Sequence, residues 1–413
     1  MKILLSHPTG NANVRAALKA FNEANMLDSF HTSIATFDGT IYEKLSLLKA
    51  LNDFNRRRFD EKIKTVTYTY PSKELGRLIA SKFNLKYFIE HEKGKYSIDS
   101  VYNYIDYCVS KKLKKKGTVQ GVYCYEDCAI NTFKIAKENG VNCFYDLPSG
   151  YWRRGRKLLK ELHKIRPDWS NTLSGLKDSE AKLNRKDTEL LLADQIIVAS
   201  SFTAQTLIDF PEKLSKIKVI PYGFPETTTS KKYDYDGNRP LKLLFVGNLS
   251  LLKGIANVLE AVENFKEHIC LTIVGRKTTD DCKPLNEGLK KHHWIPSLNH
   301  ASILELMRNS DVLIFPSLSE GFGLVITEAM SQGTPVITTN STGGKDFIIN
   351  NKNGWIVETD STNSIVSVIS ELLNTPDKVA CVGMEAIKTA ASRTWQDYQK
   401  DLVLSIKNIK NVN

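Results

Sequence analysis

The sequence predicts an α/β protein made of two doubly wound domains, each built on a parallel sheet. Short apolar runs recur along the chain, and stretches of helical periodicity separate them, as expected of strands and crossover helices. This alternation occurs twice, on either side of one polar stretch. The 413 residues also exceed the roughly 250 to 300 at which a single core stops growing. We therefore expect two Rossmann-like domains that face each other across a cleft.

The first domain is expected to span residues 1–225. Its strands are predicted at five apolar runs: KILLSH, GVYCYE, NCFYD, QIIVAS and KVIPYG. Gly10 follows the first of these strands, where a residue without a side chain lets the backbone approach a ligand, although a simple turn is the alternative. The strand ends at Glu126, Asp127 and Asp146 would place three carboxylates at the cleft.

A linker is expected at residues 226–240, a stretch rich in Thr, Lys, Asp and Gly that lacks apolar periodicity. The second domain then spans residues 241–391, with strands predicted at KLLFVG, CLTIVG, DVLIFPS and PVITT. The tail at residues 392–413 carries apolar side chains at helical spacing, so we expect a helix that packs back on the first domain.

The composition favours a soluble globular protein. Hydrophobic residues make up 41% of the chain and charged residues 25%, and no run approaches the roughly 18 apolar residues that cross a bilayer. The apolar start is too short for a secretion signal, so we expect the cytoplasm. The seven cysteines are scattered and mostly embedded in apolar runs, which indicates reduced core thiols. Cys124 and Cys128 lack a second pair at zinc-site spacing, so no metal site is predicted.

The net charge of +11 indicates an anionic partner: nucleotide phosphates, an acidic membrane face or nucleic acid. No nucleic-acid recognition motif accompanies the charge, so nucleic acid is not expected. Residues 151–166 combine basic residues with Leu158, Leu162 and Ile165 at helical spacing. This segment is either a solvated surface or a basic amphipathic helix on anionic lipid, with Tyr151 and Trp152 as interfacial anchors. A second basic cluster comprises Lys111, Lys112, Lys114, Lys115 and Lys116.

One segment, residues 311–339, says most about function. It reads as an apolar strand, a turn holding Glu320 and the run 321–323 (Gly-Phe-Gly), a short helix carrying Glu328, and a second strand. Backbone N–H groups bind anionic oxygens, whereas carboxylates accept protons from hydroxyl groups. The arrangement therefore suits a ligand that is both polyhydroxylated and phosphorylated.

A cation precedes this segment in the second domain. A predicted strand ends at Gly247, a helix begins near Gly254, and Lys253 lies at the join. An ammonium group beside the free N–H groups of a helix start suits a diphosphate, because the fixed charge and the helix dipole add.

Taken with CLTIVGRK at residues 270–277 and the run 294–297 (WIPS), this succession resembles the retaining, nucleotide-sugar-dependent glycosyltransferases of family 4. These "group 1" transferases have the two-domain GT-B fold, and their signature is two glutamates separated by seven residues, the spacing of Glu320 and Glu328. The resemblance implies that Glu328 holds the ribose hydroxyls and Glu320 a hydroxyl of the donor sugar. Further donor-site residues implied are Gly10, Gly247, Gly321, Phe322, Gly323 and Leu324.

The resemblance also implies that Lys253 neutralises the diphosphate. Asn248 departs from the family, many of whose members carry Arg there, so either Arg276, Lys277 or a residue of the first domain compensates, or the donor is held differently. Trp294 and Ile295 occupy the loop that meets the nucleobase in the family, with ordinary core packing as the alternative for each. Thr342, Gly343 and Gly344 close the pocket in many members, although Asp346 here replaces the more usual Glu nearby.

On the first domain, Asp146 lies near the position where many members have a histidine that contacts the donor sugar, and His7 is the other candidate for that role. Alternatively, Glu126, Asp127 or Asp146 would orient the acceptor hydroxyl. The run 234–236 (Asp-Tyr-Asp) has a metal-binding form found in the other large glycosyltransferase fold, but it lies in the polar linker, so no metal role is expected. Catalysis would rest on Lys253, Glu320 and Asp146, without a metal or other cofactor.

The sequence therefore predicts a hexosyltransferase-type enzyme that moves a sugar from a nucleotide diphosphate sugar to a hydroxyl acceptor, with retention as the resemblance implies. A lipid-linked saccharide of cell-envelope polysaccharide or glycolipid synthesis is the first expectation for the acceptor, with peripheral contact to an anionic membrane. The rival interpretations are a nucleotide-sugar-binding protein without transfer activity and a sugar-nucleotide epimerase on the same fold.

Overall fold

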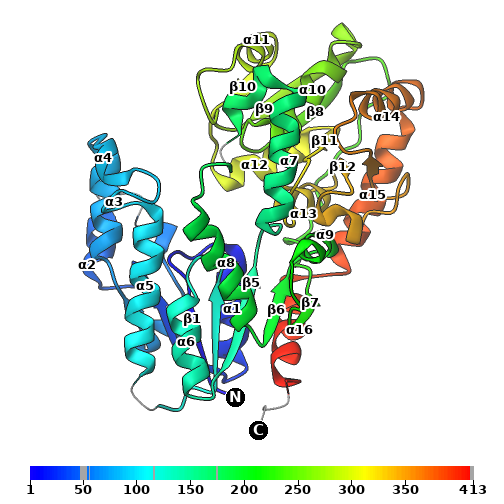
Figure 1. Ribbon diagram of the computed structural model, residues 1–413. Helices are drawn as coiled ribbons and strands as arrows, with labels where there is room; N and C mark the ends of the chain where they lie inside the picture. Colours follow the sequence, from blue (N-terminus) through cyan, green and yellow to red (C-terminus); the bar gives the residue numbers. More distant parts are fainter. Residues whose placement is uncertain (47–53, 55, 115–116, 174, 410–413) are drawn as a thin grey trace.

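Two parallel sheets organise the computed structural model, which describes residues 1–46, 54, 56–114, 117–173 and 175–409. The first sheet has seven strands in the order β3-β2-β1-β4-β5-β6-β7, and the second has six in the order β10-β9-β8-β11-β12-β13. Helices cover both sheets (Figure 1). The predicted fold class, two doubly wound parallel-sheet domains, is confirmed.

Each predicted strand coincides with an observed one. The first sheet comprises β1 (Ile3–Ser6), β2 (Leu27–Thr32), β3 (Thr67–Thr69), β4 (Gly121–Tyr125), β5 (Asn142–Leu147), β6 (Gln195–Val198) and β7 (Lys216–Val219). The second comprises β8 (Leu241–Val246), β9 (Ile269–Val274), β10 (His293–Ile295), β11 (Val312–Phe315), β12 (Val336–Thr339) and β13 (Trp355–Val357). Sequence patterns missed β2, which is partly polar, and β3, β10 and β13, which are three-residue strands at sheet edges. Such edges need no long apolar run.

The helices of the first domain are α1 (Ala12–Glu23), α2 (Ile41–Ser46), α3 (Ser72–Lys82), α4 (Lys86–Ile89), α5 (Ile98–Leu113), α6 (Ile130–Glu138), α8 (Glu180–Leu192) and α9 (Ser201–Thr206). Those of the second are α10 (Ile255–Val262), α11 (Lys283–Lys291), α12 (His300–Asn309), α13 (Leu324–Ser331), α14 (Thr362–Asn374) and α15 (Asp377–Ala391). Two further helices are α7 (Trp152–Ile165) and α16 (Trp395–Lys407). Each packs on the domain other than the one that precedes it in the sequence.

The strand order locates the ligand-binding edge. In the first sheet β1 lies between β2 and β4, and in the second β8 lies between β9 and β11, so the direction of winding reverses at β1 and at β8. Ligands of open parallel sheets bind beyond the carboxyl ends of the strands at such switch points. The segments of interest are therefore those that follow β1 and β8.

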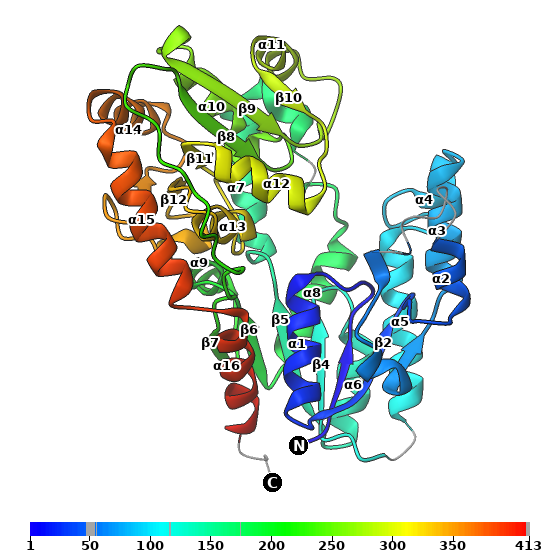
Figure 2. The ribbon, with the colours of Figure 1, turned by 180° about the vertical axis from the view of Figure 1, so that it is seen from behind.

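Helix α16 returns to the first domain and packs against α1, as Figure 2 shows from behind. Its side chains Tyr398, Leu402 and Ile406 are buried in the same core as Phe21 of α1. A capping box of Thr394 and Asp397 begins the helix. The end of the predicted tail, residues 410–413, lies outside the described residues.

Helix α7 crosses in the opposite direction. Although it follows β5 of the first domain, Leu162 and Trp169 are buried in the core of the second domain, and Leu158 packs against that core. The 3-10 turn η3 (Pro167–Thr172) completes this contact, because the Thr172 hydroxyl accepts a hydrogen bond from the Leu251 N–H at 3.0 Å. Within the range 1–225, therefore, the segment 152–173 lies with the second domain.

This position corrects the membrane interpretation of residues 151–166. The apolar stripe of α7 is covered by protein instead of facing lipid, and only Ile165 among the three predicted apolar residues is exposed. Tyr151 is buried, and its hydroxyl and the Trp152 indole N–H both donate to Asp187, at 2.9 and 2.6 Å. Neither ring is an interfacial anchor. Of the second basic cluster, Lys115 and Lys116 lie outside the described residues.

Residues 226–240 contain no helix and no regular strand, yet they are fixed to the second domain. The Lys231 ammonium donates to the Arg308 carbonyl at 2.9 Å and to the Thr334 hydroxyl at 3.0 Å, and the Tyr233 hydroxyl donates to the Gly333 carbonyl at 2.9 Å. Burial lowers the pKa of Lys231 to about 8. The segment is thus an ordered strap.

The seven cysteines are free, and most are buried as predicted, but Cys270 and Cys381 are exposed. Among the described residues, every helix is too short or too polar to traverse a lipid bilayer.

The docking of α7 makes a testable prediction. Leu162→Ala should lower the free energy of unfolding by about 2 to 5 kcal/mol, because it leaves a cavity in a close-packed core. Ile165→Ala on the same helix is the control, since Ile165 is 68% exposed. Thermal melts of both variants provide the measurement. An equal, small change in melting temperature for both would contradict the burial of α7 against the second domain.

Candidate active site

The loops after β8 and β11 bring two predicted residues together. Lys253 ends the 3-10 turn η5 (Leu251–Lys253), and Glu320 lies in the turn that follows β11. Their side chains form an ion pair, and each is only about a fifth exposed, 22% for Lys253 and 23% for Glu320. A predicted cation and a predicted carboxylate thus share one position at the carboxyl edge of the second sheet.

Close backbone packing fixes these two loops against each other. Gly254 has φ 75°, and a Cβ atom there would lie 2.2 Å from the carbonyl oxygen of Pro316, so only glycine fits. The Leu318 N–H donates to the Leu252 carbonyl at 2.9 Å, and the Ser317 hydroxyl donates to the same carbonyl at 3.1 Å. The side chains of Lys253 and Glu320 are therefore carried on loops held rigidly side by side.

The glycine turn after Glu320 leads directly into α13. Gly323 has φ 87° and is the N-cap residue of that helix. The N–H groups of Leu324 and Val325 belong to the first helical turn and therefore have no intrahelical acceptor. Together with the positive end of the helix dipole, they suit an anionic oxygen close to Lys253.

The first domain supports this turn from behind. The Gly321 carbonyl accepts hydrogen bonds from the hydroxyls of Ser200 and Thr203, the latter at 3.0 Å. A Cβ atom at Gly321 would lie 2.0 Å from the carbonyl oxygen of Pro148, so the turn lies directly against the segment that follows β5. The Phe322 ring is buried, edge-on to Tyr222 with centroids 4.9 Å apart. Phe322 therefore contributes core packing, and only its backbone is placed to meet a ligand.

The loop after β12 closes around the same turn. The Gly343 N–H donates to the Phe322 carbonyl at 2.9 Å, and the Thr342 hydroxyl accepts from the Gly344 N–H at 3.1 Å. Asp346 reaches the first domain, where it accepts from the Ser201 N–H at 2.8 Å. The carboxylate of Asp346 thus caps α9 across the domain boundary.

Glu328 lies on the second turn of α13 and is 20% exposed. Its carboxylate hydrogen-bonds with the Nε2 atom of His300, the first residue of α12, at 3.0 Å. Glu320 precedes the start of α13 and Glu328 follows it. Along the chain, one glutamate therefore lies on each side of the residues whose N–H groups begin the helix.

Asn248 and Lys253 line a cavity of about 210 Å³. Leu159 and Thr172, from the segment 152–173, also line it. Of the two second-domain cations expected to compensate for Asn248, Lys277 is engaged, because its ammonium lies 2.9 Å from Asp280. Arg276 is exposed.

Trp294 is half-buried in β10. Its indole N–H donates to the Gly275 carbonyl at 2.9 Å, and the Lys277 ammonium lies 5.3 Å from its ring centroid. The Ile295 carbonyl accepts from the Gly275 N–H at 3.0 Å, and its side chain packs against the core. A Cβ atom at Gly275 would lie 1.8 Å from the Gly247 carbonyl oxygen, so the ends of β8 and β9 also meet backbone to backbone. Trp294 and Ile295 both pack against the core of the second domain, and the exposed part of the Trp294 ring is free to contact a ligand.

Asp146 does not reach the cleft as predicted. It is 2% exposed, and the Tyr123 hydroxyl donates to its carboxyl group at 2.6 Å. Burial raises the pKa of Asp146 to about 7, and the Tyr123 hydrogen bond opposes that rise. The side chain is thus directed into a buried cluster of tyrosines that includes Tyr123 and Tyr125.

His7 and Gly10 are also packed. Burial lowers the pKa of His7 to about 4, so the ring is neutral, and its Nδ1 atom accepts from the Thr9 N–H at 2.9 Å. The Phe59 ring lies where a Cβ atom of Gly10 would be, at 2.4 Å, and the Gly10 carbonyl accepts from Arg15 at 2.7 Å. These contacts fit the simple-turn alternative for Gly10.

Glu126 and Asp127 lie in an ion-pair network with α8. The Lys186 ammonium is 3.2 Å from Glu126 and 3.4 Å from Asp127, and Arg185 is 2.8 Å from Asp127. Glu126 also accepts from the Ser149 hydroxyl at 3.0 Å, beside the segment that supports Gly321. Glu126 is thus the nearer of the two to the contact between the domains.

Sequence patterns missed the residues of the first domain that hold the glycine turn, namely Pro148, Ser200 and Thr203. The available signal was the run 200–203 (Ser-Ser-Phe-Thr) after an apolar strand, which is typical of a helix N-cap. Ser200 does cap α9, since it accepts from the Thr203 N–H at 3.0 Å. No pattern indicates that the same hydroxyl reaches a turn more than 100 residues away.

Residues 227–389 match the family model of the glycosyl transferases group 1. Among curated relatives, the capsular polysaccharide biosynthesis glycosyltransferase CapM of Staphylococcus aureus is 28% identical over 223 residues, which cover 49% of this chain and 58% of CapM. Spore coat protein SA of Bacillus subtilis is 25% identical over 255 residues, which cover 54% of this chain and 67% of that protein. The matches span between about half and two thirds of these relatives.

Among solved structures, HepE from Anabaena in complex with UDP-glucose superposes with a TM-score of 0.63 at 15% identity, covering 99% of this chain and 100% of HepE. At this identity the likeness shows the fold, and the predicted GT-B arrangement of two parallel-sheet domains is confirmed. The family match covers the domain that carries Lys253, Glu320 and Glu328. The second domain of this chain is therefore similar to the glycosyl transferases group 1 family over residues 227–389.

Proposed function

We propose that this protein is a glycosyltransferase that moves a sugar from a nucleotide diphosphate sugar to a hydroxyl acceptor with retention of the anomeric configuration. The observation that carries the proposal is the Lys253–Glu320 ion pair beside the start of α13, with Glu328 on the second turn of that helix. A cation, free N–H groups and two carboxylates thus belong to one pair of neighbouring loops and the helix that follows. This set of groups matches a diphosphate flanked by two sets of hydroxyls, those of the ribose and those of the sugar.

Donor binding would exchange the partners of this ion pair. The Lys253 ammonium would turn to the diphosphate oxygens, whose negative charge exceeds that of one carboxylate, and Glu320 would accept a proton from a sugar hydroxyl. Glu328 would accept from the ribose hydroxyls. The glycosidic bond to phosphate breaks, a bond forms from the acceptor oxygen to the anomeric carbon on the same face, and the acceptor proton passes to the departing phosphate. Lys253 and the first turn of α13 stabilise the charge on that leaving group without a metal ion.

The similarities support this proposal. HepE was solved with UDP-glucose, and CapM is named for capsular polysaccharide biosynthesis. For the present chain we propose a nucleotide-sugar donor of that kind and an acceptor of cell-envelope polysaccharide or glycolipid synthesis. Of the carboxylates in the first domain, Glu126 is the best placed to orient the acceptor, because it lies beside Ser149 at the contact between the domains.

Turnover separates this proposal from a binding protein that has kept the pocket. Glu320→Ala and Lys253→Ala should each slow hydrolysis of the bound donor by about 100-fold or more, the effect of losing one preorganised electrostatic contact. The exposed Lys266 provides the control Lys266→Ala, which should leave the rate unchanged. Release of nucleoside diphosphate from a panel of nucleotide sugars is the measurement. Unchanged hydrolysis in both site variants would refute the assigned roles.

A second prediction concerns the nucleoside. Glu328→Gln should weaken binding of the nucleoside diphosphate alone by about 10- to 100-fold, because hydrogen bonds to a charged group contribute roughly 1.5 to 3 kcal/mol. Glu305→Gln, at an exposed position of α12, is the matched control. Isothermal titration calorimetry measures both. Binding as tight as that of the unaltered protein would place the ribose elsewhere.

The buried Asp146 should act on stability and not on the chemical step. Burial raises the folded-state pKa of Asp146 to about 7, above its ordinary value of 3.8. The stability that the protonated carboxyl contributes is therefore complete below about pH 4 and is lost as pH rises through 7. The melting temperature of Asp146→Asn minus that of the unaltered protein should therefore be higher at pH 8 than at pH 5. The catalytic rate should stay within a few fold. A rate loss as large as that of Glu320→Ala would instead make Asp146 catalytic.

A further inference from the structure

Exposed apolar side chains gather at one end of the first domain. Fifteen large apolar side chains are exposed among the described residues, and six of them lie within residues 79–98. Tyr87 is 80% exposed and Phe83 is 67% exposed. Single exposed apolar residues are ordinary, but a contiguous group marks an interaction surface. The group comprises Ile79, Phe83, Leu85, Tyr87, Phe88 and Ile98, and residues 72–98, which carry it, are called the tip below.

Packing and hydrogen bonds order the tip. Gly76 of α3 makes room for the Tyr96 ring, which a Cβ atom would meet at 2.4 Å. The Tyr96 N–H donates to the Phe88 carbonyl at 2.8 Å, and the ring of Phe88 lies 6.1 Å from that of Tyr96 and 5.6 Å from that of Tyr87. The loop after α4 is thus folded back on the helix, and these contacts hold the aromatic rings at the surface.

Lysines surround these rings. The acidic groups of the tip are mostly occupied: Glu74 is buried against Arg57 and Arg77, and Glu92 accepts from the Ser179 N–H at 2.8 Å. Glu90 is the exposed acid, and it lies 3.5 Å from Lys93. The surface charge is therefore positive, supplied by Lys73, Lys82, Lys86, Lys93 and Lys95. Aromatic rings with a lysine rim match the boundary between acyl chains and anionic headgroups.

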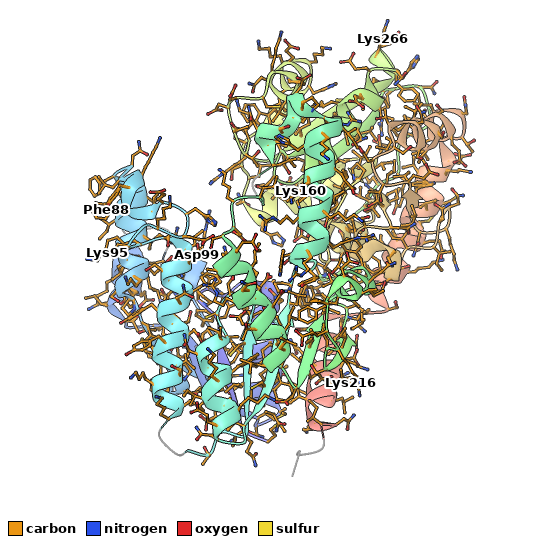
Figure 3. All side chains as sticks on the ribbon, viewed as in Figure 1. Phe88, Lys95, Asp99, Lys160, Lys216 and Lys266 are labelled. Carbon is orange, nitrogen blue, oxygen red and sulfur yellow. The ribbon has the colours of Figure 1, made fainter. Side chains whose placement is uncertain are left out.

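The position of the tip relates it to the site. Helix α3 begins directly after β3, so the tip stands at the edge of the first sheet where the strands end, the edge that carries Glu126. Figure 1 places α4 beyond the sheet, apart from the second domain, and Figure 3 shows Phe88 and Lys95 on the outer side of the tip. A planar surface could meet the tip without entering the contact between the domains.

The rival basic surface lacks an apolar component. The leucines of α7 are covered by the second domain, which leaves Lys157, Lys160 and Lys164 on a solvated face (Figure 3 labels Lys160). A face that is only charged attracts an anionic membrane weakly. A charged face with exposed rings also gains free energy when the rings insert into the headgroup region. The tip is the surface that offers both.

We infer that the tip docks on the surface of a bilayer containing anionic lipids and so brings the acceptor-side edge of the first domain to the membrane. The inference rests on the proposed function, because it assigns the acceptor to the lipid-linked class. Phe83, Tyr87 and Phe88 insert at the level of the headgroups, and the lysines pair with lipid phosphates.

Sedimentation with vesicles tests the inference independently of catalysis. The full chain should bind vesicles of phosphatidylcholine and phosphatidylglycerol and bind vesicles of phosphatidylcholine alone at least about tenfold more weakly. Combined Phe83→Ser, Tyr87→Ser and Phe88→Ser should lower binding to the anionic vesicles by at least about tenfold. Donor hydrolysis in the absence of vesicles should be unchanged, because the tip lies outside the donor site. Phe83→Ser with Tyr87→Ser alone, at side chains that are 67% and 80% exposed, should also leave the melting temperature unchanged and still weaken vesicle binding.

A matched variant on the rival surface completes the design. Combined Lys157→Glu, Lys160→Glu and Lys164→Glu should leave most of the vesicle binding intact. Equal loss from the α7 variant and the tip variant, or no binding of the full chain to anionic vesicles, would overturn the inference. So would a dimer in solution that the tip substitutions dissociate, because a second copy would then cover the tip. Loss of donor hydrolysis by Glu320→Ala with vesicle binding retained tests the proposed function separately.

Discussion

The arrangement of the site depends on one backbone contact between the domains, the approach of Gly321 to Pro148. Any side chain at residue 321 would occupy the volume of the Pro148 carbonyl oxygen. The Gly321 carbonyl would lose its solvent partners in this contact, and the hydroxyls of Ser200 and Thr203 replace them. Each such hydrogen bond contributes only about 1 kcal/mol net, but leaving the buried carbonyl without a partner would cost more. The first domain thus sets the position of the turn that carries Glu320 and starts α13.

The second domain uses the same device within itself. Gly254 lies against Pro316, and Gly275 lies against Gly247, so the loops after β8, β9 and β11 meet backbone to backbone. Side chains that project from loops packed in this way have little freedom, and preorganised charges cost little reorganisation at the moment of reaction. The glycines of the sequence motifs therefore allow the loops to pack closely, and this packing fixes the positions of the polar side chains beside them.

Sequence patterns predict the burial of a segment but not the surface that buries it. An apolar run states that a segment is buried, and this is enough to predict nine of the strands, including those whose carboxyl ends carry Lys253 and Glu320, but not the partly polar β2. It does not state which surface buries the segment. The periodicity of Leu158 and Leu162 was correctly seen, but the second domain, not lipid, covers them. Asp146 was placed at a strand end, yet the pleat directs its side chain toward Tyr123 in the core. No sequence pattern identifies the exposed rings of the tip, because an apolar side chain has the same identity whether or not another element packs against it.

The crossing segments explain why a charged pocket can persist between two domains. The chain passes between the domains after β5, before α8, after β7 and before α16, and Thr394 pairs with Phe224 where two of these passages meet. These tethers keep Gly321 against Pro148 and so keep Lys253 and Glu320 partly shielded from water. A partly buried charge without a partner is costly, and the ion pair removes that cost within the protein itself. Under the proposed function, a nucleotide diphosphate sugar would replace the ion pair by offering each charge a new partner at once, phosphate for the ammonium and a hydroxyl for the carboxylate. A nucleoside diphosphate or a free sugar alone would satisfy one half of that exchange, so the pairing of the two charges would favour the intact donor.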